Sequence, residues 1–153
     1  MYHFFSEHEH IHDTYIDIVG SDVNHIKNVL RLKTGESLLI SSGDNIDYTC
    51  HIAQIDEEHI RADIDSVDER GRELASKIYL FQGLPKADKM ELVIQKAVEL
   101  GAFEVIPVAM KRSVVKLDAK KAESKVKRWN AIAESAAKQS KRSILPQDRK
   151  SVV

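Results

Sequence analysis

Residues 84–108, LPKADKMELVIQKAVELGAFEVIPV, decide the fold of this chain. Their apolar side chains recur at helical spacing, on one predicted face: Met90, Val93, Ile94, Ala97 and Val98. Asp88 stands before this run as a predicted N-cap, with Glu91 three residues later in the capping-box position. Gly101 follows it, where helices commonly end in a left-handed glycine. The stretch therefore predicts a helix bounded by Asp88 and Gly101.

Two apolar segments, residues 77–82 and 103–108, flank this helix and have the character of strands. Strand, helix and strand within about 30 residues form a βαβ unit, which builds parallel sheets. Ligands of such sheets bind beyond the carboxyl ends of the strands. Lys86 and Lys89 lie there, at the start of the helix, where phosphate is favoured. We predict that they contact phosphate; the alternative is an ordinary solvated first turn.

The first half of the chain predicts a different architecture, with several short strands, two tight turns and one small helix. The predicted strands are residues 1–5, 14–19, 36–41, 47–55 and 59–67, and the turns are 42–45 and 56–58. Ser21 is the predicted N-cap of a helix through Leu30, whose buried face is Val23, Ile26, Val29 and Leu30. This pattern indicates a compact or half-open β-barrel. A polar, glycine-containing run at 68–73 predicts a linker, so the expected domains are 1–70 and 71–153.

After the βαβ unit, residues 118–139 predict a long amphipathic helix. Its apolar stripe is Ala122, Val126, Trp129, Ala133 and Ala136. Trp129 on this stripe is interpreted as a core residue rather than a stacking platform for a base. Residues 144–146 are a candidate third strand. Three parallel strands with two helices would leave apolar faces uncovered, which α/β folds do not normally tolerate.

Charge is distributed unevenly although the net charge of the 153 residues is −1. Residues 1–74 carry 6 Lys/Arg against 16 Asp/Glu, whereas residues 111–153 carry 13 against 4. This asymmetry favours an anionic partner for the C-terminal region. The alternative is a dipolar protein whose charged faces are simply solvated.

The single cysteine, Cys50, cannot form an internal disulfide and lies in an alternating strand pattern, so it predicts a core residue in a reducing cytoplasm. The N-terminus lacks the features of a signal peptide, and no apolar segment is long enough for a membrane span. His8, His10 and His12 would share one face of a strand. No Cys or Asp/Glu cluster at ligand spacing supports them, so no metal site is expected.

Three separated motifs resemble one family. They are HIKNVLRLKTGESLLI (25–40), KADKMELVIQKAVELGAFEVIPV (86–108) with Arg112 and Ser113, and RWNAIAESAAKQSKR (128–142). In this order and spacing they resemble the 16S rRNA uridine N3-methyltransferase family, RsmE. The resemblance implies a PUA-like β-barrel followed by a SPOUT-type α/β domain. It also implies a homodimer that uses S-adenosylmethionine to methylate uracil-1498 of 16S rRNA in the small ribosomal subunit.

The chain departs from this family in its glycines. All six are dispersed, and the glycine-rich loops that build the family's C-terminal trefoil knot and hold the methyl donor have no counterpart. We therefore expect the first three-fifths of such an enzyme, without the knot. As it stands, the chain should not bind S-adenosylmethionine well, and no residue is assigned to that cofactor.

The resemblance implies two sets of candidate residues. The predicted RNA contacts are Arg31, Lys86, Lys89, Arg112 and Arg142, of which Arg142 could instead hold strand ends near the pocket. Further motif residues could organise the floor of the active site, a dimer face or the strand ends: His25, Glu91, Gln95, Lys96, Glu99, Glu134, Gln139 and Ser140. For the polar stripe on the first helix the alternative is plain surface, and for His25 it is packing or capping. The catalytic base is not assigned.

Three hypotheses remain open at this point. The first is an rRNA methyltransferase seen without its donor-binding part. The second is a non-catalytic RNA- or ribosome-binding module whose contact surface is the basic region 111–142. The third is a structural or dimerisation fragment without a ligand.

Overall fold

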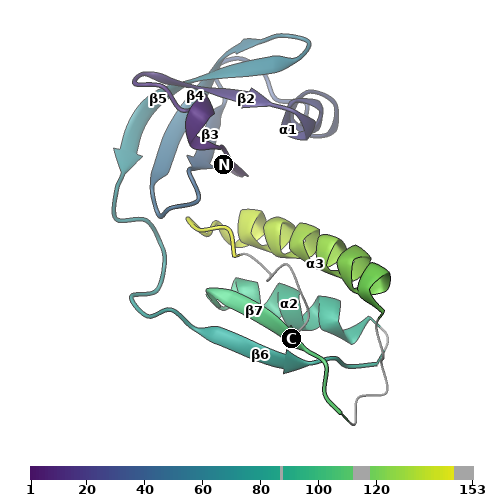
Figure 1. Ribbon diagram of the computed structural model, residues 1–153. Coiled ribbons are helices and arrows are strands. Elements are labelled where there is room, and N and C mark those ends of the chain that lie inside the picture. Colours follow the sequence, from purple (N-terminus) through teal and green to yellow (C-terminus); the bar gives the residue numbers. More distant parts are fainter. Residues whose placement is uncertain (87, 112–117, 147–153) are drawn as a thin grey trace. The chain divides into compact units, whose positions relative to one another are not determined.

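The computed structural model describes residues 1–86, 88–111 and 118–146. The chain divides into two compact units, Met1–Arg72 and Glu73–Val153, and each is described by itself (Figure 1). Across the described residues, no helix combines the length and the apolar character that a membrane span needs.

The first unit is built on one five-stranded sheet in the order β1-β3-β4-β5-β2. The strands are β1 (Tyr2–Phe5), β2 (Tyr15–Val19), β3 (Ser37–Ser41), β4 (Asp47–Ile55) and β5 (His59–Asp68). Strands β1 and β3 pair in parallel and the other neighbours are antiparallel. Because β1 and β2 stand at opposite ends of this order, the barrel is of the predicted half-open type.

The interior of this unit is apolar and includes Cys50. Ile16, Ile26, Leu38, Ile40 and Ile60 are fully buried around it. The Cys50 thiol is fully buried, and burial raises its pKa to about 12. The interpretation of Cys50 as a core residue is confirmed, since a thiol of such high pKa is a poor nucleophile.

The predicted helix from Ser21 to Leu30 differs from the observed one. Helix α1 (Ser21–Asn24) continues into a π-helical turn, η2 (His25–Leu30), and Gly20, not Ser21, occupies the N-cap. Val23 and Ile26 are buried as predicted, but Val29 is 60% exposed. A π-helix closes its hydrogen bonds over five residues rather than four, so helical spacing no longer keeps Val29 on the buried face.

The second unit contains the predicted βαβ arrangement. Strand β6 (Tyr79–Gly83), helix α2 (Lys89–Glu99) and strand β7 (Glu104–Val108) follow one another, and the two strands pair in parallel. Met90, Ile94 and Val98 form the buried face of α2.

Both ends of α2 can be compared with their predictions. At the C-terminal end, Gly101 has φ +95°. The backbone N–H groups of Gly101 and Ala102 donate to Val98 and Ala97, which closes the helix in a Schellman motif. At the N-terminal end, Asp88 occupies the N-cap, but its side chain makes no capping hydrogen bond, so the predicted capping box does not form.

Helix α3 (Ala119–Ser140) packs beside α2 (Figure 1). The Asp118 side chain caps it by accepting from the backbone N–H of Lys121 at 2.8 Å. Its buried residues are Val126, Trp129, Ala133, Ala136 and Ala137, which confirms Trp129 as a core residue. The third strand predicted at residues 144–146 does not form there.

Several large apolar side chains of this unit remain exposed, among them Tyr79 and Phe81 on β6 and Leu92 and Leu100 on α2 and its C-cap. Strand β7, by contrast, has both of its faces buried at Val105 and Ile106. The apolar surface expected for a short parallel sheet is therefore present on β6.

Candidate RNA-contact surface

Lys86 and Lys89 are exposed where α2 begins, directly after the carboxyl end of β6. The backbone N–H of Leu84 still donates to Val108 at 3.1 Å, so strand pairing holds the chain until just before the lysines. Unbonded amide groups and the helix dipole give this end of α2 a positive potential. The exposure of both lysines at this end is compatible with the predicted phosphate contact, which stays a prediction.

The polar stripe of α2 is largely engaged within the protein. Gln95 and Lys96 both donate to the Glu99 carboxylate, at 3.0 and 2.7 Å. The hydrogen bond from Lys96 lowers the pKa of Glu99. The Glu91 carboxylate forms an ion pair with Arg128 of α3, with 2.8 Å between Nε of Arg128 and Oε1 of Glu91. Within this stripe, Gln95, Lys96 and Glu99 bond to one another along α2, and only Glu91 reaches α3.

Arg142, a predicted RNA contact, lies in the interior of the second unit. Its side chain is 7% exposed and forms a salt bridge with Glu73, whose side chain is 9% exposed. The same guanidinium donates to the carbonyl oxygens of Val98 and Ala102 at the C-terminal end of α2. The backbone N–H of Ile144 also donates to Glu73, at 3.1 Å. Arg142 thus joins three segments of the unit and is not presented to a phosphate, in contrast to the predicted RNA contact.

The other motif residues at this end of α3 make local contacts. Glu134 pairs with Lys138 one turn later at 3.0 Å. The Ser140 hydroxyl donates to the carbonyl oxygen of Ala136 at 2.7 Å, and Gln139 is exposed. Of the expected roles, holding chain ends in place fits Arg142 best. Arg112 lies outside the described residues.

In the first unit, the candidates His25 and Arg31 are both exposed and belong to the π-helical turn and its end. The His25 ring meets Phe4 edge-on at 6.3 Å between centroids. Arg31 has a left-handed backbone with φ 56° and ψ 39°. The geometry therefore gives His25 a packing contact and leaves the Arg31 guanidinium at the surface.

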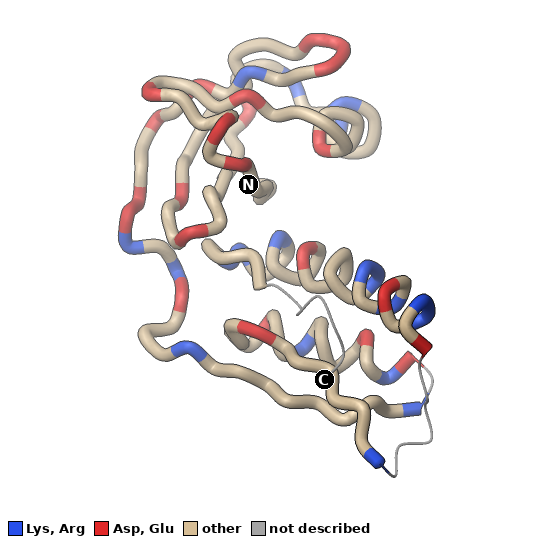
Figure 2. Tube along the Cα trace, in the orientation of Figure 1, with Lys and Arg blue, Asp and Glu red and all other residues tan. Residues whose placement is uncertain are grey.

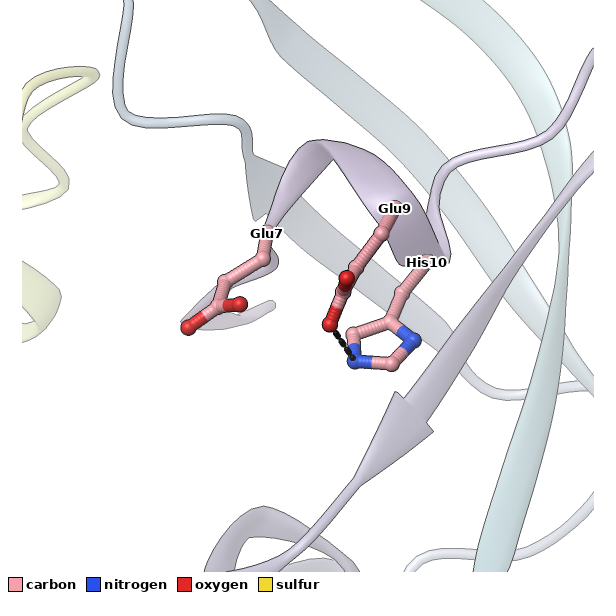
Figure 3. Close-up of side chains that lie close together, drawn as sticks. All are labelled: Glu7, Glu9 and His10. Atoms are coloured by element: carbon pink, nitrogen blue, oxygen red, sulfur yellow. Dashed lines mark ion pairs between the residues drawn. The ribbon is translucent and has the colours of Figure 1, made fainter.

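The histidines near the N-terminus do not share a strand face. His8 and His10 lie on a 3₁₀ turn, η1 (His8–His10), while His12 pairs with Asp17 at 3.3 Å. Glu7, Glu9 and His10 bring ligand atoms within 4.8 Å of one another, and Figure 3 shows Glu9 and His10 side by side. Exposed acidic groups commonly gather in this way without an ion, so this group supports no metal site.

The two units have opposite charge. Met1–Arg72 carries 15 Asp/Glu against 6 Lys/Arg, and Glu73–Val153 carries 9 against 17. Figure 2 shows acidic positions throughout the first unit and basic positions along α3. A polyanion such as RNA is therefore attracted by the second unit and needs a local basic spot on the first.

The two largely buried carboxylates of the second unit are both engaged by arginine side chains. Glu91 pairs with Arg128, and Glu73 pairs with Arg142. The glycines Gly83 and Gly101 each stand alone, with Met110 and Leu74 packed against them. We therefore assign none of these residues to S-adenosylmethionine.

The interaction of Glu73 with Arg142 has no signal in the sequence. The two residues lie 69 positions apart, and Glu73 belongs to the run interpreted as a linker. The family motif singled out Arg142 as a candidate site residue, but nothing in the motif indicates that its partner is Glu73.

Comparisons with known proteins cover both units. Residues 72–151 match the family model of an RNA methyltransferase domain, and residues 18–65 match that of an RNA methyltransferase PUA domain. Ribosomal RNA small subunit methyltransferase E of Bacillus subtilis is 42% identical over 129 residues, which are 84% of this chain and 50% of that protein. A second relative, ribosomal RNA small subunit methyltransferase E 2 of Borreliella burgdorferi, is 32% identical over 80% of this chain and 50% of its own length.

Solved structures agree with these matches. The chain superposes on ribosomal RNA small subunit methyltransferase E from Neisseria gonorrhoeae bound to S-adenosyl methionine, with a TM-score of 0.86 and 27% identity over 100% of this chain. A Legionella pneumophila protein described as a putative methyltransferase, in complex with the same cofactor, gives 0.84 and 31% over 98%. The chain spans half the length of the two curated relatives and 62% of the two solved chains.

Proposed function

Because the chain belongs to the RNA methyltransferase family that includes ribosomal RNA small subunit methyltransferase E, we propose that it represents part of an enzyme that methylates N3 of a uridine, uracil-1498, in 16S rRNA. Its first unit is a PUA half-barrel and its second is a partial methyltransferase domain. The observation that carries the proposal is the match of both units, in the family's order, to RNA methyltransferase models.

Methylation at N3 requires a uracil withdrawn from its stack, removal of its N3 proton and a methyl group in line with N3. S-adenosylmethionine supplies that methyl group when it is bound. The residues of this chain would serve to position the RNA for these steps, because phosphate contacts fix its register and orientation. Lys86 and Lys89 support this role, since both are exposed at the N-terminal end of α2.

We further propose that this chain alone neither binds the methyl donor well nor transfers a methyl group. The support is that Glu73 and Glu91 are engaged by arginines within the described part of the second unit, and that Gly83 and Gly101 are each packed against a side chain. Titration calorimetry with S-adenosylmethionine should give no saturable heat. A micromolar dissociation constant would contradict this proposal and leave the family assignment intact.

The second candidate function is a non-catalytic RNA- or ribosome-binding module. The excess of 17 Lys/Arg over 9 Asp/Glu in Glu73–Val153 favours it over a fragment with no ligand. Both RNA-binding hypotheses predict that the chain binds a fragment of the 16S decoding region, with an affinity that falls steadily as salt rises. Lack of saturable binding at low salt would leave only the structural hypothesis.

A variant pair locates the contact. The double variant Lys86→Gln, Lys89→Gln should bind the RNA fragment more weakly. The slope of log affinity against log salt should decrease by about one unit for each phosphate that the variant no longer binds. Lys96→Gln is the matched control, because Lys96 is exposed on the same helix but donates to Glu99 near the opposite end. Equal reductions in affinity in both variants would show a general effect of charge and contradict a site at the start of α2.

We propose a homodimer as the assembly, the small ribosomal subunit as the partner and the cytoplasm as the location. The exposed apolar side chains Tyr79, Phe81 and Leu100 support an interface, since exposed apolar surface of this kind is typical of contact surfaces. Sedimentation at increasing concentration should show self-association that Phe81→Ser weakens. A monomer at all concentrations would contradict the dimer.

A further inference from the structure

Two helices of this protein end in a basic residue with a left-handed backbone. The π-helical turn η2 ends at Arg31 with φ 56° and ψ 39°, and α3 ends at Lys141 with φ 55° and ψ 44°. A residue with a Cβ is strained in this region, whereas glycine adopts it freely. Helix α2 shows the unstrained solution, since Gly101 takes the equivalent position with φ +95°.

The side chains of Arg31 and Lys141 are not needed to end their helices. At η2 the backbone N–H of Leu32 donates to Ile26 at 3.0 Å. At α3 the backbone N–H of Arg142 donates to Ala137, also at 3.0 Å. Backbone groups close both ends, so glycine would make the same hydrogen bonds with less strain.

Each of these side chains is exposed on a firmly held backbone. Lys141 immediately precedes Arg142, whose buried guanidinium is fixed by Glu73 and by carbonyl groups of the α2 end. Arg31 follows Ile26, which is fully buried, by a little more than one turn. A cation on such a support loses little freedom when it binds a ligand, because its backbone is already fixed.

Arg31 also lies in the longest stretch of the acidic unit that carries no carboxylate side chain. Between Asp22 and Glu36 stand three of the unit's six Lys/Arg, namely Lys27, Arg31 and Lys33. Elsewhere in the unit, Arg61 pairs with Asp63 at 2.8 Å and Arg72 with Asp47 at 3.6 Å. Lys27 donates to the carbonyl oxygen of Asp56 at 2.8 Å and lines a hollow with Glu57 and Glu58, so Arg31 is the cation of this stretch that we consider for an RNA phosphate.

We propose that Arg31 and Lys141 each contact a backbone phosphate of the RNA, and that their strained conformation is retained for this contact. Strain that glycine would relieve is typical of functional positions. The motif around Arg31 already predicts an RNA contact there, whereas Lys141 is included only in the basic region 111–142 and is not singled out by the sequence. The structure assigns Lys141 the role that the buried Arg142 does not fill. The inference rests on the RNA-binding part of the proposed function.

A competing explanation is that a cation at a helix C-terminus interacts favourably with the helix dipole. The two explanations make opposite predictions for Arg31→Gly and Lys141→Gly. If the basic residue is present in place of glycine because it binds phosphate, each glycine variant should melt about 4 °C higher, because backbone strain is relieved. If the residue is present because its charge stabilises the helix dipole, each glycine variant should melt at a lower temperature and bind RNA with unchanged affinity.

The experiment uses the full chain, thermal melts by circular dichroism and fluorescence anisotropy with a labelled fragment of the 16S decoding region. We expect each glycine variant to bind at least about threefold more weakly and to reduce the salt slope by about 1. Arg31→Asn and Lys141→Asn, which tolerate the left-handed region but carry no charge, should show the same reduction in binding.

Lys127→Gly is the control, since Lys127 is an exposed lysine in the interior of α3 and not at a left-handed helix end. It should melt lower, because glycine destabilises a helix interior. An equal reduction of RNA affinity in this control, or unchanged affinity in the variants at 31 and 141, would overturn the inference while the RNA-binding proposal stands. A parent chain that binds no RNA would overturn the proposed function and this inference together.

Discussion

The buried pair of Arg142 and Glu73 gives the most demanding prediction for stability. In Arg142→Ala, the Glu73 carboxylate would stay in the interior with the backbone N–H of Ile144 as a remaining donor. The carbonyl groups of Val98 and Ala102, which accept from the guanidinium in the parent chain, would lose that donor. The substitution therefore leaves the Glu73 charge without its cationic partner and the Ala102 carbonyl without the guanidinium, while the Val98 carbonyl still accepts from the backbone N–H of Gly101 at 3.0 Å.

The expected cost follows from burial. Removing one partner of a buried ion pair costs about 3–5 kcal/mol, because the remaining charge is poorly solvated. That is a large share of the roughly 5–15 kcal/mol that stabilises a typical domain. With a urea dependence of about 1–3 kcal/mol per molar, the midpoint of unfolding should fall by about 1 M or more.

Urea unfolding followed by tryptophan fluorescence is a suitable assay. The chain has one tryptophan, Trp129, which is 3% exposed within α3, so the signal reports the unit that contains the pair. Arg128→Ala is the matched control, because Arg128 pairs with Glu91 in the same unit but its side chain is 60% exposed. An exposed pair contributes about 0–1 kcal/mol.

The contrast between the two arginines decides the result. If Arg142→Ala shifts the midpoint no more than Arg128→Ala does, the buried pair is not a main support of the unit. A double-mutant cycle with Glu73→Ala adds a second test, since the double variant should be destabilised by less than the sum of the two single variants. Additive effects would refute a direct interaction.

Three other predictions concern single residues. Cys50, with a pKa of about 12 and full burial, should resist thiol reagents at pH 8 in the native protein and react after unfolding; rapid native labelling would contradict its place in the core. Gly101→Ala should lower the unfolding free energy by roughly 1 kcal/mol in urea melts, because φ is +95° and the new Cβ would lie 2.8 Å from Leu74; unchanged stability would refute the left-handed cap. The hydrogen bond from the backbone N–H of Lys121 lowers the pKa of Asp118, so its contribution is complete above the unfolded value of about 3.9 and is lost as pH falls through the folded pKa. The melting temperatures of the parent and Asp118→Ala should accordingly converge in acid, and a gap that persists at low pH would contradict this.

Local signals predicted most of the fold. Alternation along β4 and β5, the spacing of Met90, Ile94 and Val98, and Gly101 after α2 each depend on neighbouring residues, which a sequence displays directly. The predicted order of strands and helices follows from such signals. The βαβ unit and the half-open sheet could therefore be predicted from the sequence alone.

What escaped prediction depends on hydrogen-bond geometry or on distant partners. The π-helical turn places Val29 at the surface although its spacing from Ile26 suits a buried α-helical face. The N-cap Asp88 makes no side-chain hydrogen bond, and Glu91 turns to Arg128, which is 37 residues away. Similarly, Arg142 carries a charge typical of a surface residue, and only the position of Glu73 explains its burial.

The central claim is that this chain recognises the same RNA as its relatives, and competition tests it most directly. Ribosomal RNA small subunit methyltransferase E of Bacillus subtilis, the 42% identical relative, would methylate small subunits that lack the mark, with labelled S-adenosylmethionine as donor. An excess of this chain should slow incorporation of label, and the chain alone should incorporate none. The Lys86→Gln, Lys89→Gln variant should compete less well. If the excess chain leaves the rate unchanged at low salt, the chain does not recognise that substrate and the central claim is contradicted.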